Sequence, residues 1–269
     1  MNDNDIQSKI LCARIDDLCR RCETKYCPCF TSFLSPHERA VVLREAVKHP
    51  DVLCIEFTGV DFAERAVLGF FPKDLYLFEK IEDLSEDDRD EYEREADIGY
   101  VKVTGSGYRK IGHKDVLGAL MALGLKRETL GDILISDDAR EAYIVALGSV
   151  VPYICDNLVG VSSDKVKAVK ISRHEMPRKT NRFADMSLTV ASQRLDALIA
   201  SALGMSREKS KKCITSGLVS VNYTVCMSAD SGFNPGDVIS VKGGGKFLVD
   251  SLLGQTQKNR FRVIVRKYL

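Results

Sequence analysis

The sequence predicts an α+β fold built from three domains. At 269 residues the chain is longer than one typical domain. Hydrophobic residues make up 45% of it and charged residues 29%, as in ordinary soluble globular proteins. Segments with helical and strand periodicity alternate along the chain. We therefore expect an N-terminal α/β domain at residues 1–76, a central domain at 77–174, a basic linker at 175–186 and a C-terminal domain at 187–269.

Charge is distributed unevenly between the two ends of the chain. The formal net charge of the whole sequence is only +1, from 39 basic and 38 acidic residues. Residues 178–269 hold 15 Lys and Arg against 6 Asp and Glu, a net of +9, so the rest holds 24 against 32, a net of −8. A basic end on a near-neutral protein predicts a surface that binds polyanions.

Several features of the sequence indicate the cellular compartment of the protein. The first five residues are polar and acidic, without the basic and apolar regions of an export signal. The longest apolar run, near Leu117–Leu125, is too short to span a bilayer. Nine cysteines, an odd number, fit reduced thiols better than a disulfide framework. We therefore expect a cytoplasmic protein without a membrane partner.

The N-terminal domain opens with a predicted helix at 6–22, followed by the spacing C-x2-C-x4-C-x-C from Cys19 to Cys29. Clustered thiolates suit a structural zinc ion. The alternative is that Cys12 and Cys19, two turns apart, are small core residues of the helix. Because two separated C-x2-C pairs are missing, we favour the core interpretation and expect neither a metal nor a cofactor.

Further elements of this domain follow in order. Ser35, with Pro36 and Glu38 behind it, predicts a capped helix that runs to about Lys48. Strands are expected at 52–58 and 66–71, and His37 and His49 are expected on helix surfaces. Residues 79–97 then hold 11 acidic and 3 basic residues. Such a run is usually a solvated helix or linker. An acidic surface that keeps RNA off the wrong face is the less favoured interpretation.

The central domain shows a recognisable order of elements. Strands are expected at 100–103, 132–136, 142–146 and 166–171, and helices at 114–123 and 150–158. This βαββαβ order is that of ferredoxin-like domains and of RNA-recognition motifs. The third strand carries only Tyr143 where several aromatic residues would form a base-stacking surface. We therefore expect this domain to be a scaffold, or to contact RNA through its loops and first helix.

The C-terminal domain begins with two predicted helices. An apolar stripe at helical spacing is formed by Leu195, Leu198, Ile199 and Ala202, with Ser192 as a candidate cap. Ser206 is placed to cap a second helix that ends at Gly217. Strands are then expected at 219–221, 238–241, 247–252 and 260–266, with a turn at 222–224.

This last region resembles the S4 RNA-binding domain. The resemblance is carried, in order, by Arg194, Leu195, Asp196, Ser206, Arg207, Ile214, Gly217, Val219, Val221, Asn222, Gly236 and Asp237. It implies a two-helix face and a neighbouring strand loop that bind structured RNA. The order extends over roughly fifty residues, so it is more specific than a single short motif.

The whole chain resembles the bacterial YlmH-type proteins. The similarity is carried by residues 30–36, 63–65, 113–120, 123–128, 131–134, 245–247 and 258–260. It implies a cytoplasmic RNA-binding factor that associates with the large ribosomal subunit and peptidyl-tRNA when translation stalls. Two places depart from the family pattern. Residues 243–245 are richer in glycine, and Gln257 stands where a lysine is commoner, which weakens the expectation of phosphate contacts there.

We expect a non-catalytic protein that binds rRNA or tRNA, without a small-molecule substrate. Four histidines lie in different segments, without a nucleophile or carboxylate grouping. The alternatives are an RNA-modifying enzyme targeted by its S4 domain and a ribosome-tethered protein adaptor. The residues expected to bind RNA are Arg194, Arg207, Lys209, Lys211 and Lys212 at phosphates, Asn222 and Tyr223 on the adjoining loop, Ser206 at the helix start, and Lys242 and Lys246 beside the glycines.

Overall fold

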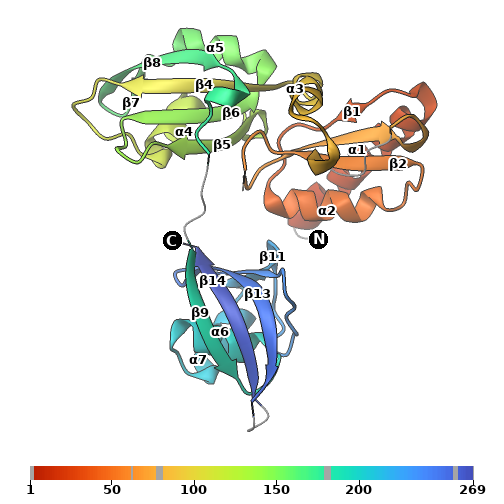
Figure 1. The fold of residues 1–269 in the computed structure, drawn as a ribbon, viewed down its shortest axis with the longest axis vertical. Coiled ribbons are helices and arrows are strands. Elements are labelled where there is room, and N and C mark those ends of the chain that lie inside the picture. The colour runs from red at the N-terminus through yellow and green to blue at the C-terminus, as the bar shows by residue number, and fades with distance from the viewer. Residues whose placement is uncertain (1–2, 62, 77–80, 179–182, 257–259, 269) are drawn as a thin grey trace. The chain divides into compact units, whose positions relative to one another are not determined.

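The computed structural model describes residues 3–61, 63–76, 81–178, 183–256 and 260–268. The chain divides into two compact units, residues 1–180 and 181–269 (Figure 1). Both combine antiparallel sheets with helices, which confirms the α+β class. No helix in the described residues is long and apolar enough to cross a membrane.

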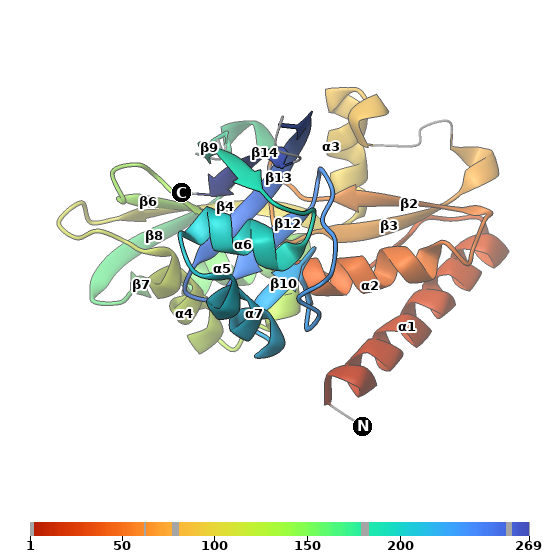
Figure 2. The same cartoon turned by 90° about the horizontal axis from the view of Figure 1, so that it is seen from below.

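The first part of unit 1 is a three-stranded sheet covered by two helices. The helices are α1 (Asp3–Lys25) and α2 (Pro36–Ala46), and the strands β1 (Cys29–Phe30), β2 (Val52–Phe57) and β3 (Val67–Pro72) lie in the order β1-β3-β2. Figure 2 shows α1 beside α2. The cap predicted for α2 is confirmed, because the Glu38 amide donates to Ser35 Oγ and the Ser35 amide to Glu38 Oε2. His49 is not on a helix surface as expected. It follows α2 and its ring lies 3.1 Å from Asp16 of α1.

The cysteines of α1 pack into this core. Cys19 and Cys22 are fully buried among Val42, Leu68 and Phe70, and the Cys22 thiol donates to the Phe70 carbonyl at 3.3 Å. Within the described residues, no group of three His, Cys, Asp or Glu side chains is placed to hold a metal ion. The burial of Cys19 confirms the core interpretation for that residue, whereas Cys12 is only partly buried.

The second part of unit 1 is a five-stranded antiparallel sheet. Its strands are β4 (Ile98–Gly105), β5 (Leu130–Ile135), β6 (Glu141–Leu147), β7 (Gly160–Val161) and β8 (Asp164–Ile171), in the order β5-β6-β4-β8-β7. Helices α4 (His113–Ala122) and α5 (Val151–Asn157) cover one face, where Val101 and Val103 of β4 meet Val116 and Ile154. The six elements expected here are all present, and the two-residue strand β7 is additional.

The other face of this sheet is partly covered by the first part of the chain. Tyr100 of β4 and Val145 of β6 are buried against Phe57 and Phe71 of the three-stranded sheet. Arg65 joins the two sheets because its guanidinium donates to the carbonyls of Phe33 and Leu130, at 2.7 and 2.8 Å. The face that an RNA-recognition motif would use for stacking is therefore partly occupied by the protein itself.

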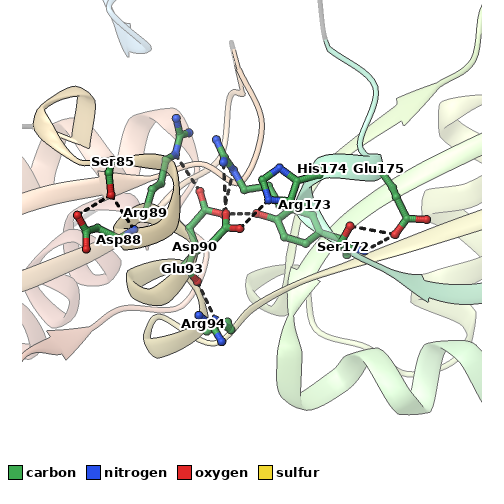
Figure 3. A network of polar contacts seen from close by, with 11 residues as sticks. Ser85, Asp88, Arg89, Asp90, Glu93, Arg94, Ser172, Arg173, His174 and Glu175 are labelled. Carbon is green, nitrogen blue, oxygen red and sulfur yellow. Dashed lines mark hydrogen bonds and ion pairs between the residues drawn. The ribbon is translucent and has the colours of Figure 1, made fainter.

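Helix α3 (Glu86–Glu95), from the acidic run, is only partly the solvated helix that the sequence predicts. Most of its carboxylates are exposed, but Glu93 is 2% exposed and accepts a short hydrogen bond from Tyr100 Oη. Arg89 Nε and Arg173 Nε lie 3.2 and 3.4 Å from its carboxylate oxygens. Figure 3 shows Arg173 and His174, which follow β8, directed toward Asp90 and Glu93. The acidic helix thus holds the segment that leads out of the sheet.

Short 3-10 turns connect several of these elements. They lie at Lys73–Leu75, Ile81–Asp83, Arg127–Thr129, Gly148–Val150 and Arg173–Glu175. In the last of them the Ser172 amide donates to Glu175 Oε2 at 2.8 Å. This bond fixes the turn immediately after β8.

Unit 2 is a six-stranded antiparallel sheet with two helices. Its helices are α6 (Leu195–Leu203) and α7 (Arg207–Thr215). The strands β9 (Phe183–Val190), β10 (Val219–Val221), β11 (Thr224–Val225), β12 (Val238–Val241), β13 (Gly245–Gln255) and β14 (Phe261–Tyr268) lie in the order β11-β10-β12-β13-β14-β9. Leu195, Leu198 and Ile199 are buried against the sheet, as their spacing predicts. Strand β9 is a correction, because its first residues, 183–186, fall in the range expected for the basic linker.

Candidate nucleic-acid interface

The two helices of unit 2 are joined at their N-terminal ends by a buried carboxylate. Asp196, in the first turn of α6, is fully buried, and its side chain accepts from Arg194 Nε at 3.1 Å and Arg207 Nη2 at 3.2 Å. Its backbone carbonyl accepts from Ser210 Oγ at 2.9 Å. Figure 2 shows the two helices side by side. Asp196 is therefore the residue that fixes α7 against α6.

The electrostatics of this carboxylate follow from its partners. Burial would raise the pKa of Asp196, but hydrogen bonds from Arg194 and Arg207 outweigh the burial and lower that pKa below its usual value. Arg194 also forms an ion pair with Asp230. The side chain of Arg194 is 33% exposed and that of Arg207 49%. The positive charge of both arginines is therefore partly balanced by acidic side chains of the same unit.

Helix α7 carries three of the lysines that are expected to bind RNA. Ser206 caps the helix as expected, because its Oγ accepts from the Lys209 amide at 3.2 Å. Ile214 turns into the core, while Lys209, Lys211 and Lys212 are exposed. The helix ends before Gly217, whose φ of +70° is the left-handed conformation predicted from the sequence.

The hairpin between β10 and β11 carries the two loop residues expected to touch RNA. Asn222 and Tyr223 both have positive φ values, 47° and 64°. The Asn222 amide holds the hairpin to the next turn: its Nδ2 donates to Asp237 Oδ1 at 2.8 Å, and its Oδ1 accepts from the Val238 amide at 2.9 Å. Both ends of this side chain are thus engaged, so Asn222 shapes the loop.

Lys246 stacks between two aromatic rings. Its Nζ lies 4.7 Å from the centre of the Tyr223 ring and 4.9 Å from that of Tyr268. It also donates to Tyr223 Oη at 3.2 Å. The two tyrosines fix the ammonium group at one position on the strand surface, where cation–π attraction supports it.

An open groove of about 460 Å³ connects the helix end with these strands. Its lining includes Gly217 and Leu218 after α7, Val225 of β11, and Lys242 and Lys246 at the β12–β13 turn. The Lys242 amide donates to the Leu218 carbonyl at 2.9 Å, which places the glycine-rich turn beside the end of α7. The expected residues therefore form two adjoining groups, one on the helices and one on the strands.

Some residues of this surface were missed by sequence reasoning. Asp230 and Tyr268 bind Arg194 and Lys246 from positions far away in the sequence. Neither lies in a motif, and no local signal predicts their pairing. In the sequence Asp196 stands out only as part of the S4 resemblance, and its burial depends on the packing of α7 against α6.

Comparison with known proteins concerns the central domain and the chain as a whole. Residues 96–175, which contain the five-stranded sheet, match the family described as "Putative RNA-binding domain in YlmH". The fold and this match define the class as an α+β protein whose central domain belongs to that domain family. The chain is also 30% identical over 234 residues to "Ribosome-associated protein quality control protein P2" of Bacillus subtilis (strain 168), covering 87% of this chain and 84% of that protein.

The chain belongs to the YlmH family. Among solved structures it is similar to "Cell division protein ylmH from Streptococcus pneumoniae", with 17% sequence identity and a TM-score of 0.49, over 63% of this chain and 94% of that one.

Proposed function

We propose that this protein is a non-catalytic RNA-binding factor that binds structured rRNA or tRNA through an S4-like C-terminal domain. In this proposal the five-stranded sheet is a ferredoxin-like, RRM-like domain. The protein acts on the large ribosomal subunit with peptidyl-tRNA, during rescue of stalled translation in the cytoplasm. The relationship to a ribosome-associated quality control protein supports this context.

The observation that carries the proposal is the exposed row of cations on α7 beside the groove of unit 2. Lys209, Lys211 and Lys212 project from a helix whose other side is fixed by Asp196 and Ile214. Phosphate groups supply most of the affinity in such complexes, through release of counterions. A rigid helix with exposed lysines and a neighbouring tyrosine–lysine stack suits a folded RNA backbone.

The test reverses the three lysines together in Lys209→Glu/Lys211→Glu/Lys212→Glu and measures affinity for ribosomal RNA at several salt concentrations. If each lysine meets one phosphate, the log–log salt slope should fall by roughly 2, at about 0.7 per contact. The matched control is Arg14→Glu/Arg21→Glu/Lys25→Glu, which makes the same change of charge at exposed positions of α1. Arg207 is left in place because its loss would remove one of the two arginines that pair with the buried Asp196.

Three results decide the proposal. We expect the α7 variant to lose most of its affinity while the α1 control keeps both affinity and slope. Equal losses in the two variants would mean that only net charge matters. An unchanged α7 variant would refute the assignment of the helix face.

A further inference from the structure

Three loops meet at the end of the five-stranded sheet that lies away from the N-terminal sheet (Figure 1). They are the β4–α4 loop at 106–112, the β5–β6 turn at 136–140 and the β7–β8 turn at 162–163. The Ile111 amide donates to the Ala139 carbonyl at 2.7 Å. The Ser106 amide donates to Asp164 Oδ2 at 3.0 Å, and Arg109 Nη1 to Ser163 Oγ. Each loop is therefore held by its neighbours.

Tyr108 projects from the middle of this anchored loop. Its side chain is 95% exposed, the most exposed of the large hydrophobic residues described. The backbone amide of Tyr108 donates to Ser106 Oγ at 3.3 Å. Three residues further along the chain, Ile111 is buried in the core between the sheet and its helices. Gly107, with a φ of +84°, permits the turn that raises the ring. The ring thus contributes little to the stability of the fold, although the backbone beneath it is fixed.

The loops that meet beside Tyr108 are rich in basic residues. The exposed basic residues of the three loops and their flanking elements are Arg109, Lys110, Lys114, Arg140, Lys165 and Lys167. The carboxylates nearby are largely engaged by local hydrogen bonds. Asp164 accepts from Ser106, Asp115 from the Gly112 amide and Asp138 from the Arg140 amide. With Asp137 included, four carboxylates stand beside these six cations, since Glu141 pairs with Lys102. The net charge at this end is therefore modestly positive.

We infer that Tyr108 and the cations around it form a second RNA contact, in which an unpaired base stacks on the tyrosine ring while the cations meet the flanking phosphates. Aromatic rings beside basic residues bind single-stranded nucleic acid in this way, since every base has a stacking face. The sheet face normally used for stacking is partly covered by Phe57 and Phe71, so the loops are the exposed alternative. The family match of residues 96–175 to an RNA-binding domain agrees with this location.

The inference rests on the proposed RNA-binding function, and its test separates the two sites. Affinity of the full chain for a short oligouridine is measured for Tyr108→Ala, Tyr108→Phe and the control Tyr153→Ala, on helix α5. Loss of one stacked base weakens binding by about 5- to 150-fold. We expect that loss only in Tyr108→Ala, because phenylalanine keeps the ring. The salt slope should stay unchanged, since no cation is removed.

A second measurement detects stacking directly. The chain has no tryptophan, so Tyr108→Trp introduces a single fluorescent indole. Oligouridine should quench that indole, and should leave the indole of Tyr153→Trp unchanged. Wild-type affinity in Tyr108→Ala, or no quenching in Tyr108→Trp, overturns the inference. A protein-docking role for Tyr108 would give that outcome.

The triple lysine variant of α7 makes the two failures distinguishable. If it weakens RNA binding while Tyr108→Ala does not, the second contact is wrong and the proposed function stands. If only Tyr108→Ala weakens binding, the loop contact stands and the helix face does not. A full chain that binds no RNA refutes both.

Discussion

Replacing Asp196 by asparagine tests whether this carboxylate fixes the two helices of unit 2. The substitution Asp196→Asn keeps the shape of the side chain and removes its charge. Three guanidinium nitrogens lie within hydrogen-bond distance of the carboxylate, at 3.1, 3.2 and 3.3 Å. A hydrogen bond to a charged group contributes about 1.5–3 kcal/mol. Since both arginines are partly exposed, water can replace some of this loss. We expect α6 and α7 to be destabilised by about 2–3 kcal/mol.

Hydrogen exchange of the full-length protein, read by mass spectrometry on peptides from α6 and α7, measures this loss segment by segment. The control is Asp230→Asn, because Asp230 pairs with the same Arg194 but its side chain is 72% exposed. Such a surface pair contributes at most about 1 kcal/mol. Equal exchange in Asp196→Asn and the wild type, or equal effects of the two substitutions, would refute the role assigned to Asp196.

The lowered pKa of Asp196 makes the stability of unit 2 depend on pH. Because the pKa of Asp196 is lowered in the folded protein, its ion pairs stabilise unit 2 above the usual carboxyl pKa of about 4. That stabilisation is lost as the pH falls through the lower, folded-state pKa. Asp196→Asn should therefore show a weaker loss of α6–α7 protection between neutral and acid pH than the wild type.

One further substitution and one chemical treatment test unit 1. Glu93→Gln should lower the free energy of unfolding by about 2–4 kcal/mol, because Arg89, Tyr100 and Arg173 lose a buried charged partner. The melting temperature should fall accordingly, and an unchanged melting temperature would contradict the role of that network. Burial raises the pKa of Cys19 and Cys22 to about 12, so iodoacetamide at pH 8 should leave both thiols unmodified in the folded protein and alkylate them in guanidinium, as read by peptide mass. Rapid alkylation of the folded protein would show that these thiols are accessible.

Local signals in the sequence predict most of the elements but few of the contacts between them. Ser35 with Glu38, Ser206, and Gly217 mark helix ends through bonds that reach only a few residues, so their positions can be predicted. The apolar stripe at Leu195 likewise identifies the buried face of α6. These signals depend on spacing alone, and the structure confirms them.

The contacts that shape the candidate surface depend on residues far apart in the sequence. Glu93 lies in an acidic run that predicts a solvated helix, yet it is buried because Tyr100 and Arg173 meet it from other elements. Arg194 was expected to be available to phosphates, but Asp196 and Asp230 share its charge. Strand β9 was missed since its partner, β14, lies about eighty residues further along the chain. Pairing over such separations leaves no local pattern.

The position of β9 has a consequence for how the C-terminal unit can be isolated. β9 is an edge strand whose residues Phe183–Val190 all pair with β14. A fragment that starts at residue 187 would delete the first half of this strand and uncover the backbone of β14 next to Tyr268. Bare strand edges recruit other chains. A fragment intended to fold alone should therefore start no later than Phe183, and cutting after that point should produce self-association in place of a monomer.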